Sequence, residues 1–185
     1  THGEPHEKNA HPHNSKDIFV VHNGIIENHE DLRSKLRAEG VRFSSQTDTE
    51  VIAHLIQMFI EKGKSFEQAI ISTTKELRGA YALGIIDKNN PESLIGVRNQ
   101  SPLVVGRGFE ENYVASDILA LAPVTNKFIY LEDSQIAHLG KSKTVVKNFK
   151  NKLIRPKTYE VDSKSYTADL EGHSHFMEKE IFQQP

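Results

Sequence analysis

The chain contains no cysteine among its 185 residues. This absence excludes disulfide bonds and thiolate metal sites, and it excludes a cysteine nucleophile carried by these residues. The sequence also lacks any apolar run close to the roughly 18 residues that a membrane-spanning helix needs, and it does not open on a signal-peptide pattern. We therefore expect a soluble, cytoplasmic protein that does not use a membrane.

Neither sign of charge is in large excess, because 23 basic residues stand against 25 acidic ones and the net charge is −2. The charges are spread along the chain and form no long basic stripe of the kind that follows phosphates, so nucleic acid is not an expected partner. Hydrophobic residues make up 37% of the sequence, which suits one globular domain with a buried core. The sequence has no internal repeats. Both ends look cut, so we expect the chain to be part of a longer protein.

Histidine is concentrated near the start of the chain. Six of the ten histidines fall within the first 29 residues: His2, His6, His11, His13, His22 and His29. Imidazole is a common zinc ligand, so a metal site is one interpretation of this cluster. No pair has His-x-x-x-His spacing on an apolar helix, however, and no nearby carboxylate completes a recognisable ligand set. We favour hydrogen-bonded loop histidines and expect no metal.

Helical periodicity dominates the first half of the chain. Residues 1–16 are polar and rich in turn formers, which indicates an ordered loop, and residues 18–22 predict a buried strand that runs into an Asn23-Gly24 turn. Apolar residues at helical spacing then predict three amphipathic helices between positions 29 and 78. Their expected N-terminal signals are Asn28, the capping-box pair Thr47 and Glu50, and the capping-box pair Ser65 and Gln68.

Short strands dominate the second half. Apolar residues at 80–86 and 93–97 flank a polar turn and predict a hairpin, and further short strands follow up to residue 155. Residues 117–121 interrupt this series with one helical turn. A helical block followed by a strand-rich half predicts the α+β class, with helices packed on layers of sheet. The polar end of the chain has little pattern and is interpreted as a tether to something further.

Two features of residues 19–50 can serve chemistry. Asn23-Gly24 can present a side-chain amide beside a backbone N–H, which is the equipment for holding an oxyanion, although an Asn-Gly pair is also a common hairpin turn. Asp48, at the expected start of a helix, can hold a ligand's ammonium group, although a helix cap or first-turn acid is the alternative. One segment would thus offer a site for an acyl group and a site for an amine.

Several stretches together resemble the glutaminase domains of the glutamine–fructose-6-phosphate aminotransferases, which are class II glutamine amidotransferases of the N-terminal nucleophile hydrolase superfamily. The resemblance runs from the first residue to the last, and its strength lies in the order and spacing of the motifs. The matching stretches are Thr1-His2-Gly3-Glu4-Pro5, Asn9-Ala10-His11-Pro12-His13, His22-Asn23-Gly24-Ile25-Ile26-Glu27-Asn28, Thr47-Asp48-Thr49-Glu50-Val51-Ile52, Leu77-Arg78-Gly79-Ala80-Tyr81-Ala82, Ser101-Pro102-Leu103, Ala115-Ser116-Asp117 and Met177-Glu178-Lys179-Glu180-Ile181.

The resemblance implies a fold, a division of the chain and partners. The fold would be the α+β, four-layer αββα arrangement, lacking its N-terminal part. Residues 1–160 would be the glutaminase domain, and residues 161–185 a segment leading to a sugar isomerase domain beyond Pro185. The intact protein is expected to be a homodimer that uses L-glutamine and the acceptor fructose 6-phosphate, with no cofactor.

The resemblance also implies roles for individual residues. In the family the N-terminal cysteine attacks the glutamine side-chain amide, and its own α-amino group acts as the base. The Asn23 side chain and the Gly24 N–H would then stabilise the oxyanion, Asp48 would hold the glutamine ammonium group, and Thr1 and His2 would line the glutamine pocket. Ammonia released there would pass to the acceptor.

This chain departs from the family because the nucleophilic cysteine and the Arg-Trp pair before Thr-His-Gly are missing. The 185 residues alone are therefore expected to be inactive. Other class II amidotransferases, acting in phosphoribosyl pyrophosphate, asparagine or glutamate chemistry, are alternatives, and so is a catalytically dead binding module. Thr1 as an N-terminal nucleophile is disfavoured because Thr1-His2-Gly3 matches an internal loop. A serine hydrolase centred on Ser101 or Ser116 is disfavoured because no Gly-x-Ser-x-Gly elbow is present.

Overall fold

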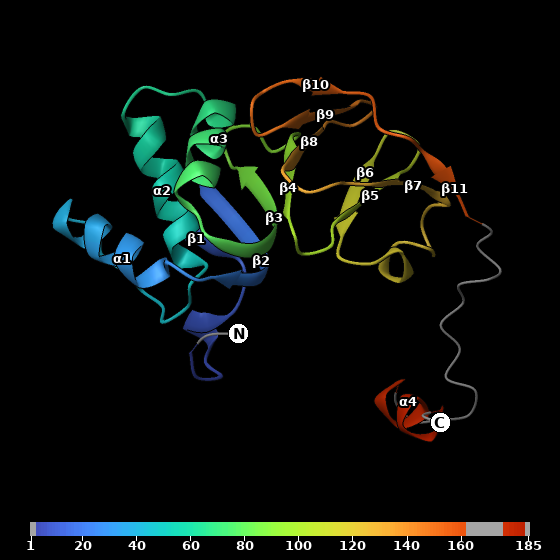
Figure 1. The fold of residues 1–185 in the computed structure, drawn as a ribbon, viewed down its shortest axis with the longest axis horizontal. Coiled ribbons are helices and arrows are strands. Elements are labelled where there is room, and N and C mark those ends of the chain that lie inside the picture. Colours follow the sequence, from blue (N-terminus) through green and yellow to red (C-terminus); the bar gives the residue numbers. More distant parts are fainter. Residues whose placement is uncertain (1–2, 162–175, 184–185) are drawn as a thin grey trace.

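The computed structural model describes residues 3–161 and 176–183. Within residues 3–161, helices and two antiparallel sheets are stacked in layers (Figure 1). The helical elements are η1 (Glu7–Asn9), α1 (His29–Ala38), α2 (Glu50–Glu61), α3 (Phe66–Glu76), η2 (Ile118–Ala120) and α4 (Phe176–Gln183). The strands are β1 (His13–Ser15), β2 (Ile18–Ile26), β3 (Gly79–Asp87), β4 (Leu94–Asn99), β5 (Val104–Arg107), β6 (Asn112–Ala115), β7 (Lys127–Tyr130), β8 (Gln135–Leu139), β9 (Thr144–Asn148), β10 (Leu153–Ile154) and β11 (Tyr159–Glu160).

A seven-stranded sheet forms the centre of the molecule. Its order is β1-β2-β3-β4-β8-β9-β10, and the nine-residue strands β2 and β3 pair along their whole length. Side chains on alternate positions of these strands, such as Val20 and Ile26 on β2 and Leu83 and Ile85 on β3, join a core with the apolar faces of α1, α2 and α3. One face of this sheet is therefore covered by the three helices that periodicity predicted.

The second sheet packs against the opposite face. It has the order β11-β7-β5-β6, and a second core lies between the sheets, with Val105 and Ile129 from the small sheet meeting Ala82, Ala137 and Leu139 from the large one. The outer face of the small sheet is covered by residues around η2, where Leu121 packs with Phe128. The α+β class is thus confirmed. Within residues 3–161 the layers are helices, sheet and sheet, with the short η2 on the far side.

Strand β2 does not end where the sequence suggested. The prediction of a strand at residues 18–22 followed by an Asn23-Gly24 turn is wrong, because β2 continues to Ile26 and pairs Asn23 with Ala82 and Gly24 with Tyr81. Ile25 and Ile26 follow the Asn-Gly pair, and the strand continues through them because Ile26 is buried in the core. Pairing along β3 therefore overrides the local turn preference of Asn-Gly.

The helix caps were predicted with mixed success. Ser65 and Gln68 form the expected capping box at the start of α3. Asn28 precedes α1 but its side chain makes no capping bond there; it donates to the Glu76 carbonyl and accepts from the Arg78 N–H, so it ties α1 to the end of α3. Long-range partners have replaced the local cap.

The third capping prediction, Thr47 with Glu50, is also wrong. Helix α2 begins after Thr49, whose side chain makes no capping bond, and the Glu50 carboxylate turns to the preceding segment. The hairpin between β3 and β4 and the short strands up to β10 are confirmed with small shifts at their ends. Short elements η1 and β1 lie within the predicted loop at residues 1–16, and α4 lies in the predicted tether.

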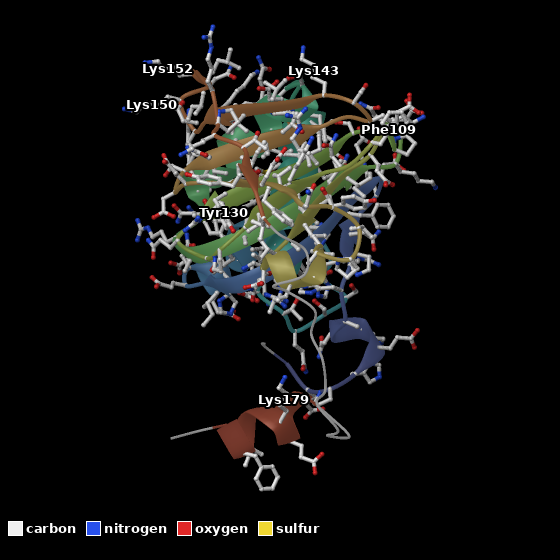
Figure 2. All side chains as sticks on the ribbon, turned by 90° about the vertical axis from the view of Figure 1, so that its right-hand side faces the viewer. Phe109, Tyr130, Lys143, Lys150, Lys152 and Lys179 are labelled. Atoms are coloured by element: carbon white, nitrogen blue, oxygen red, sulfur yellow. The ribbon has the colours of Figure 1, made fainter. Side chains whose placement is uncertain are left out.

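Exposed lysines lie in the turns on either side of β9. Lys143 is in the turn between β8 and β9, and Lys150 and Lys152 are in the turn between β9 and β10; all three lie near the top of the molecule in Figure 2. Among the helices of the described residues, none is long and apolar enough to span a bilayer.

We predict that Thr73→Val in α3 stabilises the protein. The Thr73 side chain is buried and its hydroxyl has no hydrogen-bond partner among the described residues. Valine has the same shape without the unsatisfied polar group, so the free energy of unfolding should rise by about 1 kcal/mol. Urea denaturation measures the change.

The neighbouring residue supplies a matched control. Thr74 is also buried, but its hydroxyl donates to the Ile71 carbonyl at 2.9 Å. Thr74→Val should therefore lower the free energy of unfolding by about 1 kcal/mol. Equal changes in the two variants would contradict the prediction.

Candidate functional site

A cavity of about 230 Å³ lies where three segments meet. One segment precedes β1, one is the middle of β2, and one precedes α2. The residues lining the cavity are Asn9, Ala10, His11, His22, Asn23, Gly24, Thr47, Asp48 and Thr49. Three of the residues singled out from the sequence, Asn23, Gly24 and Asp48, are therefore brought together at one cavity.

Asp48 lines this cavity from just before α2, and a hydrogen bond to strand β2 fixes its side chain. Its Oδ2 accepts a hydrogen bond of 2.8 Å from the Ile26 N–H, and the residue is only 3% exposed. Strand β1 pairs with β2 only at residues 18–20, so this contact uses the part of the β2 edge that β1 leaves uncovered. Burial and a strong backbone donor together hold the carboxylate in one place.

Gly24 lies on the same stretch of β2. Backbone N–H groups alternate between the two edges of a strand, so the Gly24 N–H points to the same edge as the Ile26 N–H. Gly24 has φ +132°, and a Cβ added there would lie 2.1 Å from the Ala80 carbonyl oxygen. Only glycine fits this position, because both the backbone conformation and the close approach of β3 exclude a side chain.

Asn23 faces the second sheet with its amide. Its Nδ2 lies 3.4 Å from Ser116 Oγ, just after β6. Sequence reasoning considered Ser116 only as a disfavoured serine nucleophile, since nothing in the sequence signals a contact between positions 93 residues apart. The amide is exposed and can exchange this long contact for another acceptor.

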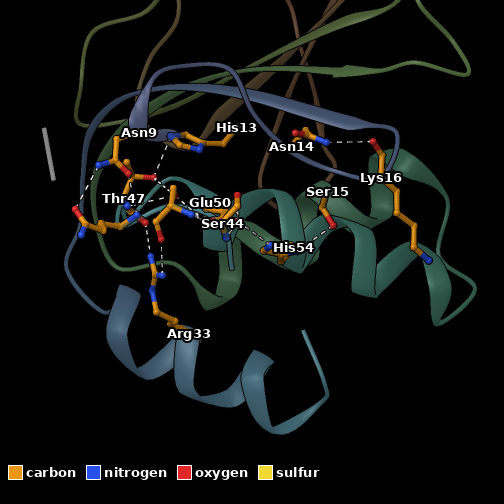
Figure 3. Close-up of polar contacts among 12 residues, drawn as sticks. Asn9, His13, Asn14, Ser15, Lys16, Arg33, Ser44, Thr47, Glu50 and His54 are labelled. Carbon is orange, nitrogen blue, oxygen red and sulfur yellow. Dashed lines mark hydrogen bonds and ion pairs between the residues drawn. The ribbon is translucent and has the colours of Figure 1, made fainter. Parts of the chain in front are cut away.

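The segment before α2 is held by Glu50 (Figure 3). The Glu50 carboxylate accepts hydrogen bonds from the N–H groups of Ser44 and Ser45 at 2.7 Å, and from their hydroxyls at 2.9 and 2.6 Å. Burial by itself raises the pKa of the Glu50 carboxyl, but hydrogen bonds from His54, Ser45 and Ser44 outweigh it and hold that pKa well below its usual range. Glu50 is therefore a buried carboxylate.

Arg33 of α1 holds the same segment from the other side. Its guanidinium donates to the carbonyls of Ser45 at 3.0 Å and Thr47 at 2.6 Å, and it lies 4.4 Å from the centre of the Phe43 ring. The carbonyls and the N–H groups of this short irregular segment are thus both bound by buried charged side chains. Asp48 follows directly, so its position is set by α1 and α2 together.

The histidines near the cavity are hydrogen-bonded, as favoured from the sequence, but only His11 lies in a loop, because His13 is in β1 and His22 is in β2. His13 Nε2 lies 3.0 Å from Thr47 Oγ1, and His22 Nδ1 lies 3.0 Å from Thr49 Oγ1. His11 Nε2 also approaches Thr49 Oγ1, at 3.3 Å. In the described part of the chain, no three His, Asp or Glu side chains are grouped so as to hold a metal ion.

Thr1 and His2, the other two residues expected in the site, lie outside the described residues. A larger cavity of about 530 Å³ lies beside Glu50 and His54, and Lys16, Arg42 and Glu61 are among its lining residues. Asn23, Gly24 and Asp48 do not line it. The smaller cavity is therefore the candidate functional site.

Comparisons with known proteins agree on one family. A model described as a glutamine amidotransferase domain matches residues 5–123. Two similar curated proteins are named glutamine–fructose-6-phosphate aminotransferase (isomerizing). The protein of Escherichia coli strain K12 is 48% identical to this chain over 187 residues, and that of Vibrio vulnificus strain CMCP6 is 45% identical over 185 residues. Each match covers 100% of this chain and 30% of the relative, so the chain spans about 30% of their length.

Solved structures show the same fold at lower sequence identity. The glutamine phosphoribosylpyrophosphate amidotransferase of B. subtilis gives a TM-score of 0.68 at 24% identity, covering 82% of this chain and 34% of that one. A glutamine aminotransferase class-II domain protein from Silicibacter pomeroyi gives a TM-score of 0.54 at 18% identity, covering 78% of this chain and 71% of that one.

We predict that the ionised Glu50 carboxylate stabilises the fold and that this stabilisation is lost in acid. A carboxyl whose pKa is lower in the folded than in the unfolded protein adds stability above the unfolded pKa of about 4.3, and this stability is lost as pH falls from there toward the folded pKa. Glu50→Gln places amide hydrogens against the donors of Ser44 and Ser45, so the free energy of unfolding at pH 7 should fall by about 3 kcal/mol. Its decline between about pH 5 and 2 should flatten.

Denaturant titrations at several pH values measure both effects. The exposed Glu110 supplies the control, because Glu110→Gln should leave the curve nearly unchanged. A Glu50→Gln variant as stable as the parent at pH 7 would contradict the role given to this carboxylate.

Proposed function

Because this chain belongs to the glutamine amidotransferase domain family, we propose that its small cavity binds glutamine and stabilises the oxyanion formed during hydrolysis of the side-chain amide. The observation that carries the proposal is that Asn23, Gly24 and Asp48 line one cavity. An amide donor, a backbone donor and a carboxylate are the groups that a molecule with a carbonyl at one end and an ammonium at the other requires.

The spacing along β2 supports this assignment. Asp48 is bound to the Ile26 N–H, and the Gly24 N–H lies two residues away on the same edge, which is about 7 Å along a strand. A glutamine lying along this edge can place its ammonium at Asp48 and its side-chain carbonyl near Gly24. Thr1 and His2 are expected to line the same pocket, and this stays a prediction.

The proposed chemistry follows from these positions. A thiolate attacks the side-chain carbonyl carbon of glutamine, and the electron pair of the C=O bond moves to oxygen. The Asn23 Nδ2–H and the Gly24 N–H donate to that oxygen, where the negative charge develops. The tetrahedral intermediate then expels ammonia after proton transfer to nitrogen, and water releases glutamate from the thioester. No residue of the chain is cysteine, so the thiol must come from outside these 185 residues.

For the acceptor, we propose fructose 6-phosphate. The support is the 45–48% identity to proteins named glutamine–fructose-6-phosphate aminotransferase. Residues 1–160 would then be the glutaminase domain and 161–185 the segment leading to a sugar isomerase domain, in a cytoplasmic homodimer. Phosphoribosyl pyrophosphate is the second candidate because a phosphoribosylpyrophosphate amidotransferase has the same fold. Product analysis with glutamine and either acceptor decides between them.

We predict that Asn23→Ala lowers kcat for glutamine hydrolysis by roughly 10²–10³, the range for losing one oxyanion donor. The measurement is glutamate release by the encoded protein that contains these residues together with its thiol. Asn89→Ala, an exposed amide in the β3–β4 turn, is the matched control and should behave as the parent. Unchanged turnover in Asn23→Ala would show that this amide is not an oxyanion donor.

We predict that Asp48→Asn mainly raises the KM for glutamine, by roughly 10–100-fold, because the ammonium contact exists before as well as during the reaction. Asparagine can still accept the Ile26 N–H, so the change removes charge with little effect on structure. Steady-state kinetics measure the effect, with the exposed Asp31→Asn as control. A lowered kcat at unchanged KM would contradict the binding role.

A further inference from the structure

Thr49 joins two histidines across the cavity. Its hydroxyl oxygen is 3.0 Å from His22 Nδ1 and 3.3 Å from His11 Nε2. His22 and Thr49 are buried, whereas His11 is exposed, so the bridge runs from the interior to the solvent side of the site. The proposed reaction assigns no part to any of these three side chains.

The bridge restricts how both rings carry their protons. A threonine hydroxyl has one proton, so it can donate to only one imidazole nitrogen, and with neutral rings the other must donate its N–H to the hydroxyl oxygen. Burial lowers the pKa of His11, opposed by Asp48, and burial followed by His11 lowers the pKa of His13. The exposed His11 ring and the buried His13 ring are therefore both neutral near pH 7.

His22 is also close to the carboxylate that the proposed function assigns to the substrate. Its Nδ1, the atom that Thr49 binds, lies 3.9 Å from Asp48 Oδ2. An imidazole N–H donated to Asp48 would compete with an ammonium ion for the same carboxylate. Among residues 3–161, the titratable groups near this pair are His11 and His13 from the segment before β2, and Glu50 two residues after Asp48.

We propose that Thr49 is a positioning residue of the glutamine site: its hydroxyl binds His22 Nδ1 and so keeps the buried ring from moving onto the Asp48 carboxylate that binds the ammonium group. This inference rests on the proposed function of Asp48. If the hydroxyl is removed, His22 Nδ1 loses its 3.0 Å partner, and Asp48 Oδ2 is the contact that the ring can take up instead. Glutamine binding weakens, while the groups around the reacting carbonyl are untouched.

The test compares Thr49→Val and Thr49→Ser in the same encoded protein. Valine keeps the shape of threonine without the hydroxyl, and we expect KM for glutamine to rise about fivefold with kcat within about twofold of the parent. Serine keeps the hydroxyl and should restore KM. Thr73→Val is the matched control, since it makes the same change at a buried hydroxyl in α3 with no described partner.

Three results would overturn the proposal: an unchanged KM in Thr49→Val, a lowered kcat at unchanged KM, or no restoration by serine. Asp48→Asn separates this from failure of the proposed function. If Asp48→Asn raises KM and Thr49→Val does not, only the role of Thr49 is wrong. If neither variant changes KM, the ammonium site itself is wrong.

A second variant serves if Thr49→Val fails to fold. Thr49→Ala also removes the hydroxyl but leaves a smaller side chain, and KM for glutamine should again rise about fivefold with kcat within about twofold of the parent. A KM for Thr49→Ala equal to that of the parent would overturn the proposal.

Discussion

The hydrogen bond from the Ile26 N–H to Asp48 joins the edge of the central sheet to the start of a helix. On one side of this contact lies β2, fixed by nine paired positions with β3; on the other lies α2, packed in the helical core. The segment between α1 and α2 has no regular structure of its own, so it depends on this contact and on its neighbours for its path. The candidate site exists because a rigid strand and a rigid helix meet there.

Buried charge is used to hold this irregular segment. Arg33 binds its carbonyls and Glu50 binds its N–H groups and hydroxyls, so the polar backbone is satisfied from both sides. Burying either ion without such partners would cost several kcal/mol. Each charge is therefore tolerable only while the segment keeps its path, and this mutual dependence makes the position of Asp48 well defined.

Sequence reasoning recovered what depends on periodicity. The three helices between 29 and 78 and the hairpin of β3 and β4 follow from apolar spacing that one core face imposes. The α+β class follows from their order along the chain. For the site, the sequence identified Asn23, Gly24 and Asp48, and the structure places them at one cavity.

What the sequence missed depends on contacts between distant positions. Asn28 and Glu50 look like residues of local helix caps. Their side-chain oxygens instead accept hydrogen bonds from the Arg78 and Ser45 N–H groups, which the fold brings close. Thr49 and His22 are 27 residues apart, and no local pattern announces their contact. The same applies to the role of Ser116 beside Asn23.

Gly24 on β2 and Gly79 on β3 each lie against a backbone carbonyl of the other strand. A Cβ on Gly24 would meet the Ala80 carbonyl oxygen at 2.1 Å, and a Cβ on Gly79 would meet the Ile25 carbonyl oxygen at 2.2 Å. Only one alignment of β2 and β3 puts both glycines at these two crowded points, so a shift of either strand by one residue would drive a side chain into the neighbouring backbone. Each glycine therefore helps to fix the alignment of the two strands independently of the other.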